Sequence, residues 1–138
     1  MSVLVLELRQ GELMIVNGAP IRFRSKTRIE LGGKARFLFG KQILRPDEAD
    51  TPARRIYYAL QVAYVGNDDE RQIGLAQARD YIEAFKSATT SALARDILDR
   101  ALASAEQDNC YEALKLVKRI MRHEAAVMQS LAPVQPEQ

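Results

Sequence analysis

Residues 21–31, IRFRSKTRIEL, alternate without interruption between two kinds of side chain. The odd positions are uncharged and mostly apolar, whereas the even positions from 22 to 28 are all cations: Arg22, Arg24, Lys26 and Arg28. Successive side chains on a β-strand point to opposite faces, so this pattern predicts β structure with an apolar underside. Neighbouring cations would lie about 6.8 Å apart on the other face, forming a row that a polyanion can follow.

Positive charge is concentrated in the first third of the chain. Nine cations against three anions give residues 1–46 a net charge of +6, and eleven against fifteen give residues 47–138 a net charge of −4. The whole chain therefore carries only +2. Such asymmetry between halves favours a nucleic acid or another anion as the partner of the basic part. The alternative is a solvated strand face that is basic by chance.

Length and composition indicate an ordinary globular protein. The 138 residues suffice for one domain, or for two small subdomains that share a core. No apolar run approaches the ~20 residues that span a bilayer, and no secretion signal is recognisable, so we expect a cytoplasmic protein without a membrane partner. The single cysteine, Cys110, fits a reducing compartment.

Residues 1–46 are predicted to form a basic antiparallel β subdomain. The β-prone segments are bounded by turn residues, above all the hairpin signal Asn17-Gly18. The expected strands cover residues 3–8, 13–16, 20–23, 27–31 and 35–39.

The pairing of the last two expected strands follows from their polarity. A three-residue loop at residues 32–34 pairs Ile29 with Phe37 and sets Glu30 opposite Arg36, whereas a two-residue loop mixes the faces. The length of the turn at residues 24–26 decides whether the cations share a face. A three-residue turn keeps Arg22 and Arg28 on one face, whereas a two-residue turn separates them.

Residues 47–132 are predicted to form a helical subdomain, followed by a flexible tail at residues 133–138. Thr51-Pro52 suits a helix start, and further starts are expected near residues 68, 91 and 109. The fold class is therefore α+β, with a small antiparallel N-terminal sheet followed by an array of about four α-helices. Helical spacing assigns these side chains, among others, to the core: Ile56, Leu60, Ile73, Tyr81, Ile82, Phe85, Leu93, Ile97, Leu98, Tyr111, Leu114, Val117, Ile120, Met121 and Met128.

The sequence gives little support to catalysis. It has no phosphate-binding loop, and one His with one Cys makes a metal site improbable, so neither cofactor nor metal is expected. His123 reads as a solvated residue near a helix end. Cys110 lies near an expected helix N-terminus, where a thiol pKa can fall, but a buried or half-buried cysteine is the better interpretation. We therefore predict that the protein is not an enzyme.

Aromatic residues near the cations allow two interpretations. Phe23, Phe37 and Phe39 alternate with basic residues, a pattern that suits stacking on single-stranded bases, but their parity places them in the core. Tyr57 and Tyr58 lie about 100° apart on the first helix, next to Arg54 and Arg55, and either bind RNA or a partner protein or pack at the core boundary.

A second basic stripe follows the last expected helix. Lys115, Lys118 (or Arg119) and Arg122 share one face at spacings of three and four. Such a stripe is usually a solvated face, but it can also extend an RNA track or pair with an acidic partner.

Several short segments, in their order and spacing, carry a resemblance to a known family. They are residues 4–12 (LVLELRQGE), 16–19 (VNGA), 43–46 (ILRP), 51–52 (TP), 56–61 (IYYALQ) and 111–115 (YEALK). Over about residues 3 to 125 the chain thereby resembles the FlbT family of flagellin-expression regulators. Where that family usually has an Asn-Gly-type turn after the third strand, this chain has the more basic FRSK at residues 23–26.

The resemblance implies post-transcriptional control, in which family members act on the 5′ untranslated region of flagellin mRNA and a small partner, FlaF, opposes them. From charge alone, the candidate RNA-binding residues are Arg22, Arg24, Lys26, Arg28, Lys34 and Arg36. An alternative is an adaptor that binds FlaF, flagellin or another protein through its helices, with candidate residues Arg54, Arg55, Tyr57, Tyr58, Lys115, Lys118, Arg119 and Arg122. A homo-oligomer is also plausible, because short sheets leave edges open and strands at residues 3–8 can pair.

Overall fold

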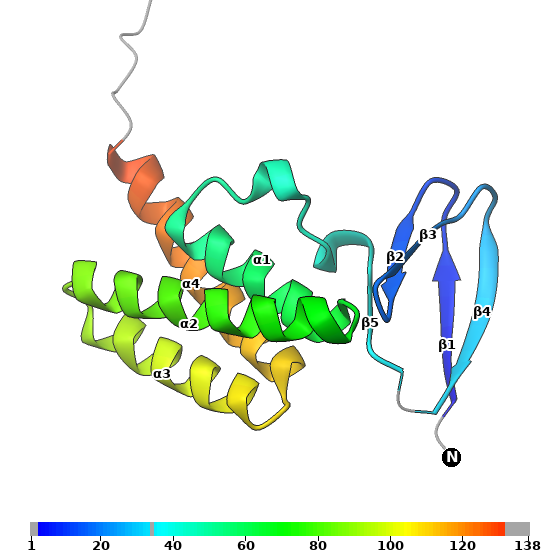
Figure 1. Cartoon of the computed structure of the whole chain (residues 1–138). Helices are drawn as coiled ribbons and strands as arrows, with labels where there is room; N and C mark the ends of the chain where they lie inside the picture. Colours follow the sequence, from blue (N-terminus) through cyan, green and yellow to red (C-terminus); the bar gives the residue numbers. More distant parts are fainter. Residues whose placement is uncertain (1–2, 34, 132–138) are drawn as a thin grey trace, which may run out of the picture.

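The computed structural model describes residues 3–33 and 35–131 and shows the expected α+β architecture. Five strands gather at one end of the molecule and four helices at the other (Figure 1). The strands are β1 (Val3–Leu8), β2 (Leu13–Val16), β3 (Ala19–Arg22), β4 (Thr27–Gly32) and β5 (Phe37–Phe39). Two short 3-10 turns, Gly40–Gln42 and Pro46–Glu48, lead to α1 (Pro52–Val65), α2 (Asp68–Ala88), α3 (Ala92–Glu106) and α4 (Cys110–Leu131).

The strands form two antiparallel sheets, one with the order β1–β4 and one with the order β3–β2–β5. The hairpin signal between β2 and β3 is confirmed: Asn17 and Gly18 both have positive φ, at 49° and 85°. A positive φ at both central residues gives the turn a twist that matches its strands. The tip of this hairpin docks on the helices, because the Gly18 N–H donates to the Val65 carbonyl at the end of α1.

The predicted hairpin of β4 with β5 is wrong. Instead, β4 pairs with β1, setting Ile29 opposite Leu6, and β5 pairs with β2, setting Phe37 opposite Val16. Glu30 therefore lies opposite Val5 rather than Arg36. Polarity alternation determines which face of a strand is buried, but it leaves open which strand lies alongside.

The two sheets enclose a small apolar core of their own. Leu6, Leu8 and Met14 are buried there. Partly buried residues from both sheets complete it: Val16, Phe23, Ile29, Leu31, Phe37 and Phe39. The three phenylalanines thus pack in this core, as their parity predicts, and do not form an open stacking platform.

Local signals place the four helices as predicted. The side chains of Thr51, Asn67 and Ser91 each accept a hydrogen bond from a backbone N–H in the first turn of α1, α2 and α3. Such caps typically contribute ~1 kcal/mol each, because they satisfy N–H groups that the helix itself cannot pair.

One larger core joins the helices to the β3–β2–β5 sheet. Ile56, Leu60, Leu98 and Ile120 are almost fully buried in it. Leu38 of β5 belongs to the same core, so this sheet packs against the helices with one face and against β1–β4 with the other.

Five residues that helical spacing assigns to the core are exposed. Ile73, Tyr81, Leu93, Tyr111 and Met128 retain between 39% and 64% of their accessible surface. Helical periodicity predicts the apolar face of a helix, but not how much of its length a neighbouring element covers. Parts of α2, α3 and α4 are therefore left with uncovered apolar side chains.

Candidate RNA-binding surface

The predicted cation row does not lie on one strand. Arg22 ends β3 in the three-stranded sheet, whereas Arg28 lies in β4 of the two-stranded sheet, and residues 23–26 carry the chain between them. In β4 the predicted alternation does hold, since Thr27, Ile29 and Leu31 are half-buried and the residues between them are exposed.

Arg28 and Arg22 consequently occupy different faces. Arg28 lies opposite Glu7 on the outer face of β1–β4, where Glu30 adds a second anion. Arg22 lies opposite Leu13, on the face of its sheet that turns toward the helices. The cations of residues 22–28 therefore do not form one continuous row, because the chain changes sheets between Arg22 and Arg28.

The structure does bring part of the row next to another loop. The Gly11 N–H donates to the Phe23 carbonyl at 2.6 Å, and Nη1 of Arg22 donates to the Gly11 carbonyl at 3.3 Å. The loop from β1 to β2 thus lies beside the connection from β3 to β4, and both loops are at the same end of the sheets (Figure 1).

These two loops and the end of β3 carry four exposed cations, which we call the basic end: Arg9, Arg22, Arg24 and Lys26. Within residues 3–33 and 35–131, none of the four forms an ion pair. In the β1–β2 loop, Oε1 of Glu12 accepts the Arg9 backbone N–H at 3.0 Å. Sequence reasoning missed Arg9, and the hairpin-like turn at Gly11 was the signal that could have placed it here.

The two remaining RNA candidates do not join the basic end. Lys34 falls outside the described residues. Arg36 precedes β5 and lies near Val16, at the opposite end of β2 from Leu13 and Arg22. Arg36 is half-buried against the helices, where its Nε has no hydrogen-bond partner. Burial raises the pKa of the neighbouring Tyr64, an effect that the Arg36 guanidinium opposes.

The partner candidates on α1 have different environments. Nη1 of Arg54 lies 2.8 Å from Asp50 Oδ1, and this hydrogen bond lowers the pKa of Asp50. Arg55 is exposed and Tyr58 is half-buried. Tyr57 cannot contact a partner, because it is 2% exposed and its hydroxyl donates to the Gln42 carbonyl at 2.5 Å. Burial raises its pKa to about 12.

The basic residues of α4 have different environments. Lys115 pairs with Glu112 at 3.0 Å, and the ammonium of Lys118 lies 5.9 Å from the centre of the Tyr57 ring. Arg119 instead lines a hollow beside α3, while Arg122 is exposed. The stripe is therefore partly used in packing.

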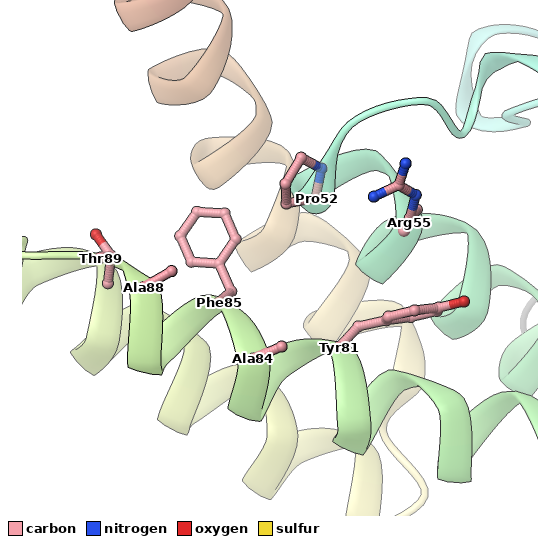
Figure 2. Close-up of a pocket in the computed structure, with 7 residues that line it drawn as sticks. All are labelled: Pro52, Arg55, Tyr81, Ala84, Phe85, Ala88 and Thr89. Atoms are coloured by element: carbon pink, nitrogen blue, oxygen red, sulfur yellow. The ribbon is translucent and has the colours of Figure 1, made fainter.

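A groove that the sequence does not reveal lies between α1 and α2 (Figure 2). It has a volume of about 380 Å³ and is lined by Pro52, Arg55, Tyr81, Ala84, Phe85, Ala88 and Thr89. Arg55 is the one charged residue among them, so we refer to this feature as the apolar groove.

Cys110 and His123 lie in different environments. Cys110 is buried, burial raises the pKa of its thiol, and Sγ lies 3.9 Å from the Ala105 carbonyl, so the thiol stays protonated at neutral pH. His123 is exposed on α4, as predicted. Among the described residues, no helix has both the length and the apolar character needed to cross a bilayer.

The comparisons with known proteins agree on one family. The sequence profile of the family described as "Flagellar protein FlbT" matches residues 4–128. A "probable flagellum biosynthesis repressor protein FlbT" of Mesorhizobium japonicum is 31% identical over 122 residues, which cover 86% of this chain and 80% of the relative. The protein of the same name from Brucella ovis is 30% identical over 134 residues, covering 95% and 86%. No solved structure matches the chain. The chain therefore belongs to the FlbT family of flagellar proteins.

Proposed function

We propose that this protein regulates flagellin synthesis in the cytoplasm by binding the 5′ leader of flagellin mRNA and limiting its translation or promoting its decay. Its relatives are named as probable repressors of flagellum biosynthesis. Regulation of this kind needs binding to RNA and no catalysis. Neither Cys110, which is buried, nor His123, which is exposed on a helix, has surroundings that suggest a reaction.

The observation that carries this proposal is the basic end. Its four cations are exposed, lie in or beside two adjacent loops, and are not neutralised by ion pairs within the described residues: Arg9, Arg22, Arg24 and Lys26. Protein cations that bind single-stranded RNA release counterions from it, so the association constant K falls as the salt concentration rises. Each phosphate contact contributes about −0.7 to the slope of log K against the logarithm of the salt concentration. Four contacts would thus give a slope of about −3.

Phosphate contacts fix position and affinity but carry no base sequence. Phe23, the aromatic residue nearest these cations, packs in the core of the two sheets and offers no open face for a base. The basic end therefore supplies the general affinity for RNA. Arg28 on the outer face of β1–β4 lies opposite Glu7, so we assign it a smaller share of that affinity.

The test is a titration of fluorescently labelled flagellin leader RNA, followed by anisotropy at low salt. Arg24→Glu should weaken binding about ten-fold, since it removes one attraction and adds one repulsion. Arg100→Glu is the matched control, because Arg100 is exposed on α3 and changes the net charge equally. Equal effects of the two substitutions would show that only net charge matters and would reject the basic end as the site.

A second candidate function is that of a protein-interaction adaptor, which the apolar groove and the exposed Ile73 and Tyr81 favour. In this function the helices would bind a FlaF-type partner, with Arg55, Tyr58 and the α4 stripe at the contact. The same titration distinguishes the two, because an adaptor gives no anisotropy change with leader RNA at low salt until its protein partner is added.

A further inference from the structure

The last two turns of α4 extend past the other helices (Figure 1). Residues 125–131, AAVMQSL, contain no charged side chain, and all seven are exposed. Val127, Met128 and Leu131 retain 42%, 53% and 78% of their accessible surface. Spacings of three and four place Leu131 on the same side of the helix as the other two. We call residues 125–131 the α4 extension.

An uncharged helix end that projects into solvent is unusual, because solvated helix faces normally carry charged residues. The preceding residue shows where the helix last touches the body. Oε2 of Glu124 accepts the Ala53 backbone N–H at 3.0 Å, which helps to cap α1. Ala53 directly follows Pro52, one of the residues that line the apolar groove. The extension and the groove are therefore neighbours on the surface.

The apolar groove, like the α4 extension, carries little charge. Its α2 wall presents Tyr81, Ala84, Phe85 and Ala88, and Pro52 closes it from α1 (Figure 2). No residue of α4 lines it, so the extension does not fill the groove of its own chain. At 1.5 Å per residue, the wall from Tyr81 to Thr89 is about 12 Å long and the extension is about 10 Å long. The lengths and the polarity of the two surfaces therefore match.

We propose that a second copy of this chain fills the groove, with the α4 extension of each protomer lying in the apolar groove of the other. A two-fold axis makes the contact isologous, so one arrangement covers both exposed surfaces of both protomers. Because each contact involves only one short helix end and one groove, the interface is small for a specific one, so dissociation is expected in the micromolar range.

Sedimentation equilibrium of the full chain, up to ~100 μM, measures this association. The wild type should be dimeric at the upper concentrations. Met128→Glu in the extension and Ala88→Lys in the groove should each raise the dissociation constant about ten-fold or more, because each buries a charge against an apolar surface. Both positions are exposed in the single chain, so circular dichroism should show an unchanged fold.

Mixing these two variants tests the reciprocity. In the mixed dimer, Glu at position 128 of one protomer meets Lys at position 88 of the other, and the second contact is wild type. Equimolar mixing should therefore restore dimers that neither variant forms alone. Leu93→Glu is the matched control, since Leu93 is 64% exposed on α3 outside both surfaces, and should leave the association unchanged.

Val5→Lys identifies the competing arrangement, a dimer through the open edge of β1, where Val5 is 45% exposed. Three results would overturn the proposal: a wild type that stays monomeric at the highest concentration, dissociation by Val5→Lys and not by Met128→Glu, or variants that fail to associate when mixed. A monomeric wild type would assign the groove to a different protein. None of these results depends on whether the basic end binds RNA.

Discussion

One buried amide fastens the connector between the sheets and the helices to α1. Gln61 on α1 is 4% exposed, and its side chain pairs with both backbone groups of Leu44. Nε2 donates to the Leu44 carbonyl at 2.9 Å, and Oε1 accepts the Leu44 N–H at 2.8 Å. Leu44 lies in the connector between β5 and α1, outside any strand or helix, and these are its hydrogen bonds among the described residues. Gln61→Leu removes both while keeping a similar volume.

The cost of Gln61→Leu can be estimated from these bonds. A buried backbone group left without a partner costs about 1–3 kcal/mol, and Leu44 is half-buried, so water recovers part of that. The added leucine contributes favourable apolar burial of about 1 kcal/mol. We therefore expect a net loss of ~2 kcal/mol in the free energy of unfolding. With a urea m value of about 2 kcal/mol/M, the midpoint falls by about 1 M.

Urea unfolding followed by circular dichroism measures this loss. Gln72→Leu is the control, because Gln72 is exposed on α2 and makes no hydrogen bond within the described residues. Agreement of the two variants within about 0.5 kcal/mol would refute the reasoning, since it would mean that the Leu44 groups lose nothing when their partner is removed.

Two further predictions concern the helices and their surroundings. Gly74→Ala should lower the free energy of unfolding in urea by ~1–3 kcal/mol, although Ala is the better helix former. The reason is that a Cβ at this position would lie 2.7 Å from the Ala59 carbonyl oxygen and 2.8 Å from the Ala63 N. A stabilised variant would contradict the close packing of α1 on α2. The pKa of Tyr57 is about 12 in the fold and about 10 in the unfolded chain, so the folded state binds more protons between these values. The stabilising contribution is present in full below pH ~10 and is lost as pH rises through ~12, by up to ~3 kcal/mol. In Tyr57→Phe, unfolding midpoints at about pH 9 and pH 11.5 should differ less than in the wild type, and an equal difference would contradict this assignment.

Local features of this fold could be predicted from the sequence. The positive-φ turn at Asn17-Gly18 and the caps at Thr51 and Ser91 depend on a few neighbouring residues, and the structure has all of them. Burial alternation in β4 also follows from the residues alone.

Non-local features could not be predicted in this way. The partner of β4 is β1, at least twenty residues away along most of the ladder, and alternation favours any apolar strand equally. For the same reason the position of Arg9 beside the cations of residues 22–26 becomes visible only once both loops are placed. Met128 belongs to the apolar face of α4, but its exposure depends on where the other helices end.

The central claim is that the basic end binds the phosphates of flagellin leader RNA, and its most direct test is the salt dependence of that binding. The triple variant Arg9→Gln, Arg24→Gln and Lys26→Gln leaves the hydrogen bond of Arg22 to Gly11 intact. We predict that the slope of log K against log salt is about −3 for the wild type and becomes shallower by about 2 in the variant, since three contacts are lost. An unchanged slope would contradict the claim, because it would place the phosphates elsewhere on the protein.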